Sequence, residues 1–321
     1  MGAPELASRI TERIERETGV PGLAALLAER LTPADLASLL LEMSRRRAAD
    51  RTPAQVLAQY ERDRFVRPSG VAPARLLDWE RVALTSLPAS FEAVALSPVC
   101  PLGTSSVVAG VHQDWAVTTS RGTEVVSDAT NVLALEAASR RRQLLRQDAR
   151  SAQAVHLAAS HRLLRPQFSG DPTRSAHFAL FALVSAGRAG SGSTFELGAL
   201  ETHLRVHLTA LRAFLGSEVP LRVTISDFSG RDREREVEAV LASLRASFEG
   251  VTAQPDPGRT HGRRYYPGLC FHLYGQANEH EYFLADGGEV DWTQRLLGNA
   301  KERLFVSGLG SERVCTIWGD G

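Results

Sequence analysis

Two arginine-bearing segments have the residue types that bind phosphate. VSGLGSER, at 306–313, places two glycines before Arg313, and HRLLRPQ, at 161–167, contains Arg162. Glycine lets a ligand approach the backbone closely, and a guanidinium group can bind two phosphate oxygens at once. A glycine turn followed by a surface arginine is also common, and arginines around one loop also suit a solvated hairpin. The spacing alone therefore leaves a phosphate site and an ordinary surface loop both open.

A third segment, HGRRYYPGLCFHLYG at 261–275, has two tyrosines beside a turn. Tyr265 and Tyr266 precede a Pro-Gly turn, and an apolar run typical of a buried strand follows. One interpretation is a hairpin corner with aromatic packing. The other is the floor of a small-molecule pocket, with Gly268 allowing close approach to the backbone.

Other common kinds of catalytic and metal site lack a supporting pattern. The nine histidines form no H-E-x-x-H motif, and the cysteines have no zinc spacing, so we predict no metal site in the protein itself. His203 and His207 are one helical turn apart without an evident third ligand, which favours packing. No G-x-S-x-G motif supports a serine nucleophile, and Lys301 is the only lysine available for a Schiff base.

Composition indicates a globular protein of 321 residues, with 43% hydrophobic and 23% charged residues. The formal net charge is zero, so nucleic-acid binding is expected to be weak or absent. No apolar run approaches the roughly 18 residues of a membrane span, and the charged N-terminus has no signal-peptide core. Three widely spaced cysteines suggest a reducing environment. We expect a cytoplasmic protein with no membrane contact.

Helical patterns dominate residues 1–72, and β-type patterns become common later in the chain. Thr32-Pro33 and Thr52-Pro53 are typical helix starts, and VRPSGVAP forms a break before a second domain at 73–321. From residue 91 onward many β-type runs follow one another with few helices between them. Runs such as SVVAGV and WAVTTS belong to this set. The pattern predicts an α+β fold, an antiparallel sheet with helices on one face. Helices are predicted at 129–147, 192–216, 231–249 and 291–300.

Taken in order, five segments within residues 75–321 resemble the catalytic domain of class II aminoacyl-tRNA synthetases, specifically histidyl-tRNA synthetase. HGRRYYPGLCF resembles the family's histidine-pocket motif, Arg-Gly-Leu-Asp-Tyr-Tyr-Thr-Gly, and DGGEVDWTQRLLGN resembles its Gly-Gly-Arg-Tyr-Asp block. HRLLRPQ with the HF at 177–178 resembles the second class motif, and VSGLGSER resembles the third. LSPVCPLGT, at 96–104, resembles the dimer-forming first motif.

This resemblance implies an antiparallel catalytic core, a homodimer, and ATP with Mg²⁺ as cofactors. It implies that Arg162 and Arg313 are the catalytic arginines, which contact the ATP phosphates. The residues implied at the nucleotide are Arg162, Arg174, Phe178, Gly308, Gly310 and Arg313. The residues implied at an amino acid or other carboxylate substrate are Glu124, His261, Arg264, Tyr265, Tyr266 and Gly268.

Several positions depart from the family pattern. Leu164 stands where the second motif has glutamate, and Glu289 stands where the Gly-Gly block has arginine. His261 replaces the pocket arginine, and Arg264 replaces the pocket aspartate. Exchanging a carboxylate that binds an ammonium group for an arginine reverses the local charge, which argues against ordinary histidine charging.

One substrate position stays open, because TSRGTEVV at 119–126 fits the family's Arg-Pro-Glu-Gly-Thr segment in two registers. Glu124 is the family's amino-group carboxylate in only one of them. The chain also ends soon after Arg313, so no anticodon-binding domain is expected, and a helical N-terminal segment is present instead.

Two hypotheses follow. In the first, the protein binds ATP and activates a small carboxylate as an acyl-adenylate for a non-standard acceptor, by positioning and charge neutralisation. In the second, it is a non-catalytic regulatory or ligand-sensing subunit, like the family's relative in ATP phosphoribosyltransferase. The N-terminal helices would then dock a protein partner.

Overall fold

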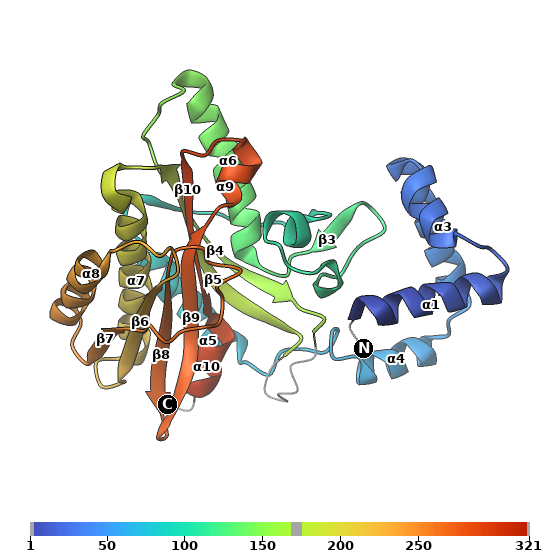
Figure 1. Cartoon of the computed structure of the whole chain (residues 1–321). Helices are drawn as coiled ribbons and strands as arrows, with labels where there is room; N and C mark the ends of the chain where they lie inside the picture. The colour runs from blue at the N-terminus through green and yellow to red at the C-terminus, as the bar shows by residue number, and fades with distance from the viewer. Residues whose placement is uncertain (1–2, 168–174, 320–321) are drawn as a thin grey trace. The chain divides into compact units, whose positions relative to one another are not determined.

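The computed structural model describes residues 3–167 and 175–319. It divides into two compact units, Met1–Asp63 with Thr118–Thr123, and Arg64–Val117 with Glu124–Gly321. The two units divide after residue 63, whereas the sequence pattern predicts a boundary at residue 72. All eight strands of the main sheet belong to the larger unit (Figure 1).

The smaller unit is helical. Its helices are α1 Ala3–Thr18, α2 Leu23–Ala25, the π-helical turn η1 Leu26–Arg30, α3 Pro33–Ala49 and α4 Pro53–Arg62. Thr32 caps α3 by accepting a hydrogen bond from the Asp35 amide, and Thr52 forms a capping box with Gln55 at α4. Both predicted Thr-Pro starts are therefore confirmed, because the threonine hydroxyl satisfies an amide that the helix leaves unpaired.

An eight-stranded sheet forms the centre of the larger unit. The strand order is β1 Phe91–Ala93, β4 Val155–Leu164, β5 His177–Arg188, β10 Glu302–Gly310, β9 His280–Val290, β8 Leu269–Ala277, β6 Leu221–Asp227 and β7 Val251–Pro255. The pairs β1–β4 and β6–β7 are parallel, and the other pairs are antiparallel. The predicted α+β class is confirmed.

Helices cover both faces of the sheet, not one face as predicted. We call the first side the α7 face; it carries α5 Pro73–Thr85, α7 Thr194–Leu215, α8 Glu234–Ser247 and α10 Ser311–Ile317. We call the other the α6 face; it carries α6 Ala129–Gln147 and α9 Trp292–Leu297 (Figure 1). The reason is visible in β5, where nine consecutive residues are buried, so both faces of that strand need a covering layer.

The region after β1 also differs from its prediction. SVVAGV lies in a turn that includes the π-helical η2 Thr104–Val108, and WAVTTS begins in the 3₁₀ turn η3 Gln113–Trp115. Only β2 Val99–Pro101 and β3 Thr123–Val125 form a small second sheet. The apolar content of these runs suggested strands, but the backbone amides of Gly103 and Ser105 turn toward the Glu124 carboxylate instead.

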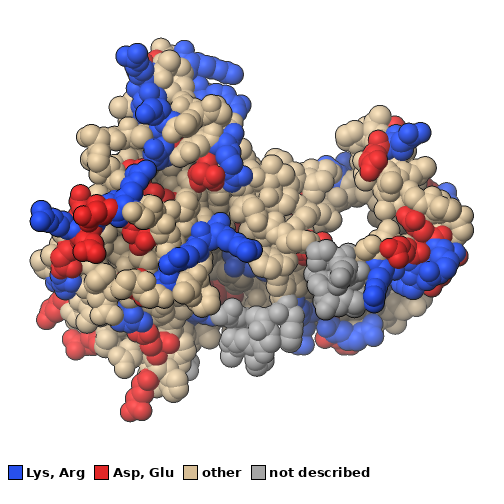
Figure 2. All heavy atoms as spheres, viewed as in Figure 1, with Lys and Arg blue, Asp and Glu red and all other residues tan. Residues whose placement is uncertain are grey.

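The three cysteines, Cys100, Cys270 and Cys315, are buried free thiols. Among the described helices, none is long and apolar enough to cross a lipid bilayer. Lys/Arg and Asp/Glu side chains lie side by side on the visible face around α8 (Figure 2).

Candidate functional site

The two predicted phosphate arginines come to the same strand–helix junction, and each already has a partner. Arg162, on β4, lies 2.5 Å from the Glu312 carboxylate at the start of α10, and its Nη1 donates to His177 Nδ1 at 2.9 Å. Arg313 donates through Nη1 to the Phe283 carbonyl at 2.9 Å. The Glu312 side chain is only 8% exposed, so the Arg162 charge is compensated by a largely buried carboxylate.

Arg162 and Phe178 lie on opposite faces of the sheet. Arg162 pairs with Ala179, one residue beyond Phe178, and successive side chains in a strand point to opposite faces. Phe178 packs against the core of the α6 face, whereas Arg162 reaches α10 on the α7 face. The structure therefore does not bring together the arginine and the aromatic ring that the resemblance assigns to one nucleotide.

The chain segment 64–72 contributes to the same network around Arg162. Ser69 donates to Glu312 Oε2 at 3.0 Å, and the Arg67 carbonyl lies 2.6 Å from His177 Nε2. The carbonyl of Pro166, in the loop after β4, accepts from the Arg64 guanidinium at 2.7 Å. Arg162 thus belongs to a network of the protein's own polar groups, although its side chain stays 43% exposed.

The two tyrosines pack on the α6 face together with charged residues that the family motifs do not include. We call this group the tyrosine site; it consists of Asp128, Arg165, Arg259, Tyr265, Tyr266 and Asp286. The ring of Tyr265 stands edge-on to that of Tyr266 at 4.8 Å and to that of Trp292 at 5.5 Å. Burial, together with the nearby aspartates, raises the pKa of both tyrosine hydroxyls well above its ordinary value.

Two carboxylates and an arginine form one side of the tyrosine site. Asp128 caps α6 through the Thr130 amide at 2.9 Å and accepts from the Arg165 guanidinium at 3.2 Å. That guanidinium lies 5.2 Å from the centre of the Phe178 ring. Burial, followed by repulsion from Asp128, raises the pKa of Asp286 to about 6, although Arg259 and Arg165 oppose the shift. Asp286 can therefore take up a proton near neutral pH.

Arg259 closes the other side. It is 6% exposed and lies 5.8 Å from the ring centres of both Phe228 and Tyr266. Its Nε donates to the His261 carbonyl at 3.0 Å, but its Nη1 is buried and has no hydrogen-bond partner in the described part of the chain. A buried cationic donor without an acceptor destabilises the folded state, so an acceptor that reached Arg259 Nη1 would be bound favourably.

The other predicted substrate residues lie elsewhere. Glu124 is fully buried and accepts from the amides of Gly103 and Ser105 and from Gln113, so it shapes the η2 turn. Burial alone would raise its pKa, but the hydrogen bonds it accepts from these groups hold that pKa below the ordinary value. The side chains of His261 and Arg264 are exposed. Arg174 lies outside the described residues.

The predicted ligand-approach glycines face protein atoms. A Cβ added to Gly268 would overlap the carboxylate of Glu289, which accepts from the Leu269 amide at 2.9 Å and from Arg233 at 3.0 Å. A Cβ added to Gly308 would contact the Leu180 side chain, and one added to Gly310 would contact the Arg313 side chain. At Gly268 the small residue thus makes room for Glu289, the residue that stands where the family has arginine.

We expect Gly268→Ala to destabilise the protein by about 1–3 kcal/mol, because the added methyl must displace Glu289 from two hydrogen bonds. Urea unfolding followed by circular dichroism would measure the loss. Gly198→Ala is the matched control, since nothing lies within 4 Å of the added Cβ and alanine has a higher helix propensity than glycine at this position in the second turn of α7. Equal stability of the two variants would contradict the packing role of Gly268.

Four residues of the tyrosine site are not predicted from the sequence, namely Asp128, Arg165, Arg259 and Asp286. Asp128 carries a usable signal, because Asp-x-Thr directly before a predicted helix is an N-cap pattern that places a carboxylate there. Arg165 lies within the second motif, three positions after the arginine that the family pattern selects. Arg259 and Asp286 carry no local signal, because their burial depends on distant segments.

The described residues fit ATP and Mg²⁺ poorly in the positions that the resemblance implies. Arg162 is neutralised by Glu312, and the Phe178 ring lies beside the Arg165 guanidinium. No group of three or more acidic, histidine or cysteine side chains that could hold a metal ion occurs in the described chain. A phosphate at Arg162 would therefore have to compete with the Glu312 carboxylate.

Sequence comparison finds no matching family model and no matching curated protein. Solved structures do match. Histidyl-tRNA synthetase from S. aureus, in its apo form, has a TM-score of 0.56 and 13% identity over 78% of this chain and 68% of that one. A protein from Bacillus halodurans, described as an ATP phosphoribosyltransferase regulatory subunit/histidyl-tRNA synthetase, has a TM-score of 0.55 and 15% identity over 79% and 83%.

A histidine–tRNA ligase subunit from Alicyclobacillus acidocaldarius has a TM-score of 0.54 and 16% identity over 78% of this chain and 96% of that chain. These similarities show the fold: the chain is folded like these class II aminoacyl-tRNA synthetase-like structures. Within that class, these three similar structures are histidyl-tRNA synthetase and its paralogs, as the motif order predicted.

Proposed function

We propose that this protein is a ligand-binding regulatory member of the class II synthetase-like fold and does not form acyl-adenylates. One observation carries the proposal: Arg162 is neutralised by Glu312 and lies on the face opposite Phe178 and the tyrosine site. Activation of a carboxylate needs free positive charge at the phosphates and the substrate beside them. The description of the Bacillus halodurans protein includes a regulatory subunit, which is consistent with such a role.

For the tyrosine site we propose a small molecule with a carboxylate as the ligand. The unpaired Nη1 of Arg259 calls for an anionic acceptor, and the two tyrosine rings supply apolar walls. An amino acid would also place its ammonium group near Asp286 and Asp128. We also propose that the protein is a cytoplasmic homodimer. Light scattering would measure the mass of the assembly.

The test measures ATP–pyrophosphate exchange across amino acids and organic acids, alongside thermal shift with the same acids. We expect no exchange above the protein-free background, and a rise in melting temperature with at least one acid, because a ligand of the native state stabilises it. Arg259→Ala should abolish that rise. Exchange with any acid would reject the proposal, and an Arg259-independent shift would move the ligand to another site.

The adenylate-forming alternative has one supporting observation. Arg162 and Arg313 lie at the same β10–α10 junction, so release of Glu312 would leave two guanidinium groups near one place. ATP with Mg²⁺ would be held there. This alternative predicts exchange activity that Arg162→Ala abolishes, and Glu312→Gln should increase it by removing the competing carboxylate.

A further inference from the structure

A cavity of about 280 Å³ lies at the end of the sheet where α7 and α8 begin, and no residue of the tyrosine site lines it. Its walls come from the β5–α7 loop, the β6–α8 loop, the first turns of both helices and the start of β10. The charged lining residues are Arg231, Arg233, Arg303, Glu196, Asp232 and Glu236. This volume is just below the range of drug-sized pockets, so it suits a small metabolite.

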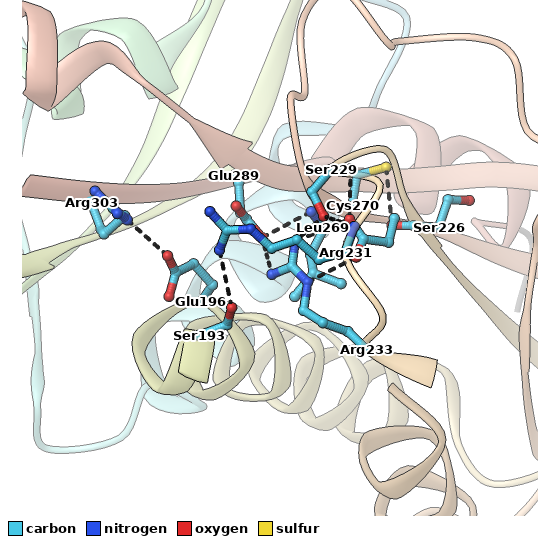
Figure 3. Close-up of polar contacts among 11 residues, drawn as sticks. Ser193, Glu196, Ser226, Ser229, Arg231, Arg233, Leu269, Cys270, Glu289 and Arg303 are labelled. Atoms are coloured by element: carbon cyan, nitrogen blue, oxygen red, sulfur yellow. Dashed lines mark hydrogen bonds and ion pairs between the residues drawn. The ribbon is translucent and has the colours of Figure 1, made fainter. Parts of the chain in front are cut away.

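Two of the three arginines are already committed to protein partners (Figure 3). Arg233 is 5% exposed and pairs with Asp227 at 2.8 Å and with Glu289 at 3.0 Å. Arg303 donates to Glu196 Oε1 at 2.8 Å. Arg231 is different: it is exposed, and its Nη1 reaches Ser193 Oγ at 3.5 Å, the limit of a hydrogen bond. Of these arginines, Arg231 is the one poised to take an anionic group.

One of the two carboxylate oxygens of Glu196 has no donor. The residue is 5% exposed, it lines the cavity, and its Oε2 is buried without a hydrogen-bond partner in the described structure. A buried carboxylate oxygen is normally satisfied, and an ammonium group entering the cavity would satisfy this one.

Two helix N-termini add donors for an anion. Ser193 is the N-cap of α7 and Arg233 is the N-cap of α8, and neither side chain caps its helix. The Thr194 amide of α7 already donates to the Ser191 carbonyl, but neither helix start has a side-chain cap, and the helix dipole favours negative charge there. The cavity thus offers an unmet acceptor at Glu196 and unmet donors at Arg231 and the helix starts.

We propose that this cavity binds a zwitterion of the α-amino acid class, with its ammonium group on Glu196 and its carboxylate on Arg231 and the helix amides. A simple cation would leave the donors unmet, and a simple anion would leave Glu196 unmet and near its own charge. The inference does not depend on the function proposed for the tyrosine site.

Calorimetric titration of the full chain with the twenty L-amino acids tests the proposal. We expect at least one to bind, and its decarboxylated amine and its deaminated acid each to bind at least tenfold more weakly. Glu196→Gln, which keeps the acceptor for Arg303, and Arg231→Ala, at an exposed position, should each weaken binding at least tenfold. Arg235→Ala, an exposed arginine of α8 outside the lining, should not change it.

Absence of binding by all twenty amino acids would overturn the inference. So would binding that is unaffected by both Glu196→Gln and Arg231→Ala. If Arg259→Ala abolished the binding while those two variants did not, the ligand would belong to the tyrosine site; the cavity proposal would then fail and the proposed function would stand.

Discussion

Arg141→Ala should lower the free energy of unfolding by about 3–5 kcal/mol, which is a large part of the stability of an ordinary domain. Arg141 and Glu302 are both fully buried and form a bidentate ion pair, with Nε–Oε2 and Nη2–Oε1 distances of 2.8 and 2.9 Å. The arginine also donates to the Ser151 and Gln153 carbonyls. Its removal leaves the fully buried Glu302 carboxylate without its cation and without a donor.

The neighbouring Arg142 provides the matched control. It is exposed and makes a 3.4 Å hydrogen bond to the Leu296 carbonyl, so Arg142→Ala should change stability by less than about 0.5 kcal/mol. Replacing both charges, as in Arg141→Met with Glu302→Leu, should recover most of the loss, because no unpaired charge remains. Urea unfolding of the four proteins gives these values.

An Arg141→Ala protein within about 1 kcal/mol of the parent would show that water reaches Glu302, contrary to its burial. The pair connects the middle of α6 to the first residue of β10, so it ties the helix of the α6 face to the central strand. Arg141, within the arginine run 140–142, is therefore a structural residue.

Acidification should unfold the protein well above the pH at which most domains lose structure, because buried histidines must stay neutral in the native state. His203 and His207 are fully buried on α7 and share Ser307 Oγ, at 2.8 Å each. Ser185 Oγ lies between two histidines, 2.9 Å from His203 Nε2 and 2.7 Å from His156 Nδ1. Burial lowers the pKa of His207 to about 3 and that of His203 well below the ordinary value.

The direction follows from the two states. In the unfolded chain a histidine binds a proton below about pH 6.5, whereas the buried histidine of the native protein does not. The free energy of unfolding is therefore unaffected by these histidines above pH 6.5, and it falls as the pH decreases toward the folded pKa. Each neutral histidine costs about 1.4 kcal/mol for every pH unit below 6.5. His207, with a folded pKa of about 3, amounts to roughly 3 kcal/mol at pH 4.5, and the lowered pKa of His203 adds to the loss in the same direction.

The measurement is urea unfolding at several pH values between 7.5 and 4.5, for the parent and for His207→Phe. Phenylalanine does not titrate and enters a site already bordered by the Phe181 and Phe271 rings, while Ser307 keeps His203. The variant should show a shallower loss of stability with acid, by about 1.4 kcal/mol per pH unit. His280→Asn, at an exposed position, should retain the parent slope. Identical slopes for the parent and His207→Phe would contradict the buried neutral histidine.

Local elements of this fold were predictable from the sequence because their signals act over a few residues. The helix predicted at 129–147 is α6 Ala129–Gln147, and Gly216 ends α7 in a positive-φ conformation as expected. The order of five short motifs also predicted the class of fold, although no single motif defined it. Hydrophobic periodicity, caps and turn residues are properties of neighbouring positions, so they are legible in one chain.

The tyrosine site combines residues that the sequence singled out with residues that it did not. The rings of Tyr265 and Tyr266 pack against each other, and the charged residues beside them include Arg259 and Asp286, which carried no local signal. The contacts of Glu124 also depend on packing: its carboxylate accepts from two backbone amides at the η2 turn, which overlaps the run SVVAGV that the sequence predicted as a strand.

The fold class and the helices predicted at 129–147, 192–216, 231–249 and 291–300 could thus be derived from the amino-acid sequence. The direction of Arg162 toward α10, its neutralisation by Glu312 and the helices on both faces of the sheet became known only from the packed chain. Whether a charge is available to a ligand depends on partners such as Ser69 and Glu312, which are 243 positions apart. Such pairings depend on strand register and helix docking, which no short segment of sequence specifies.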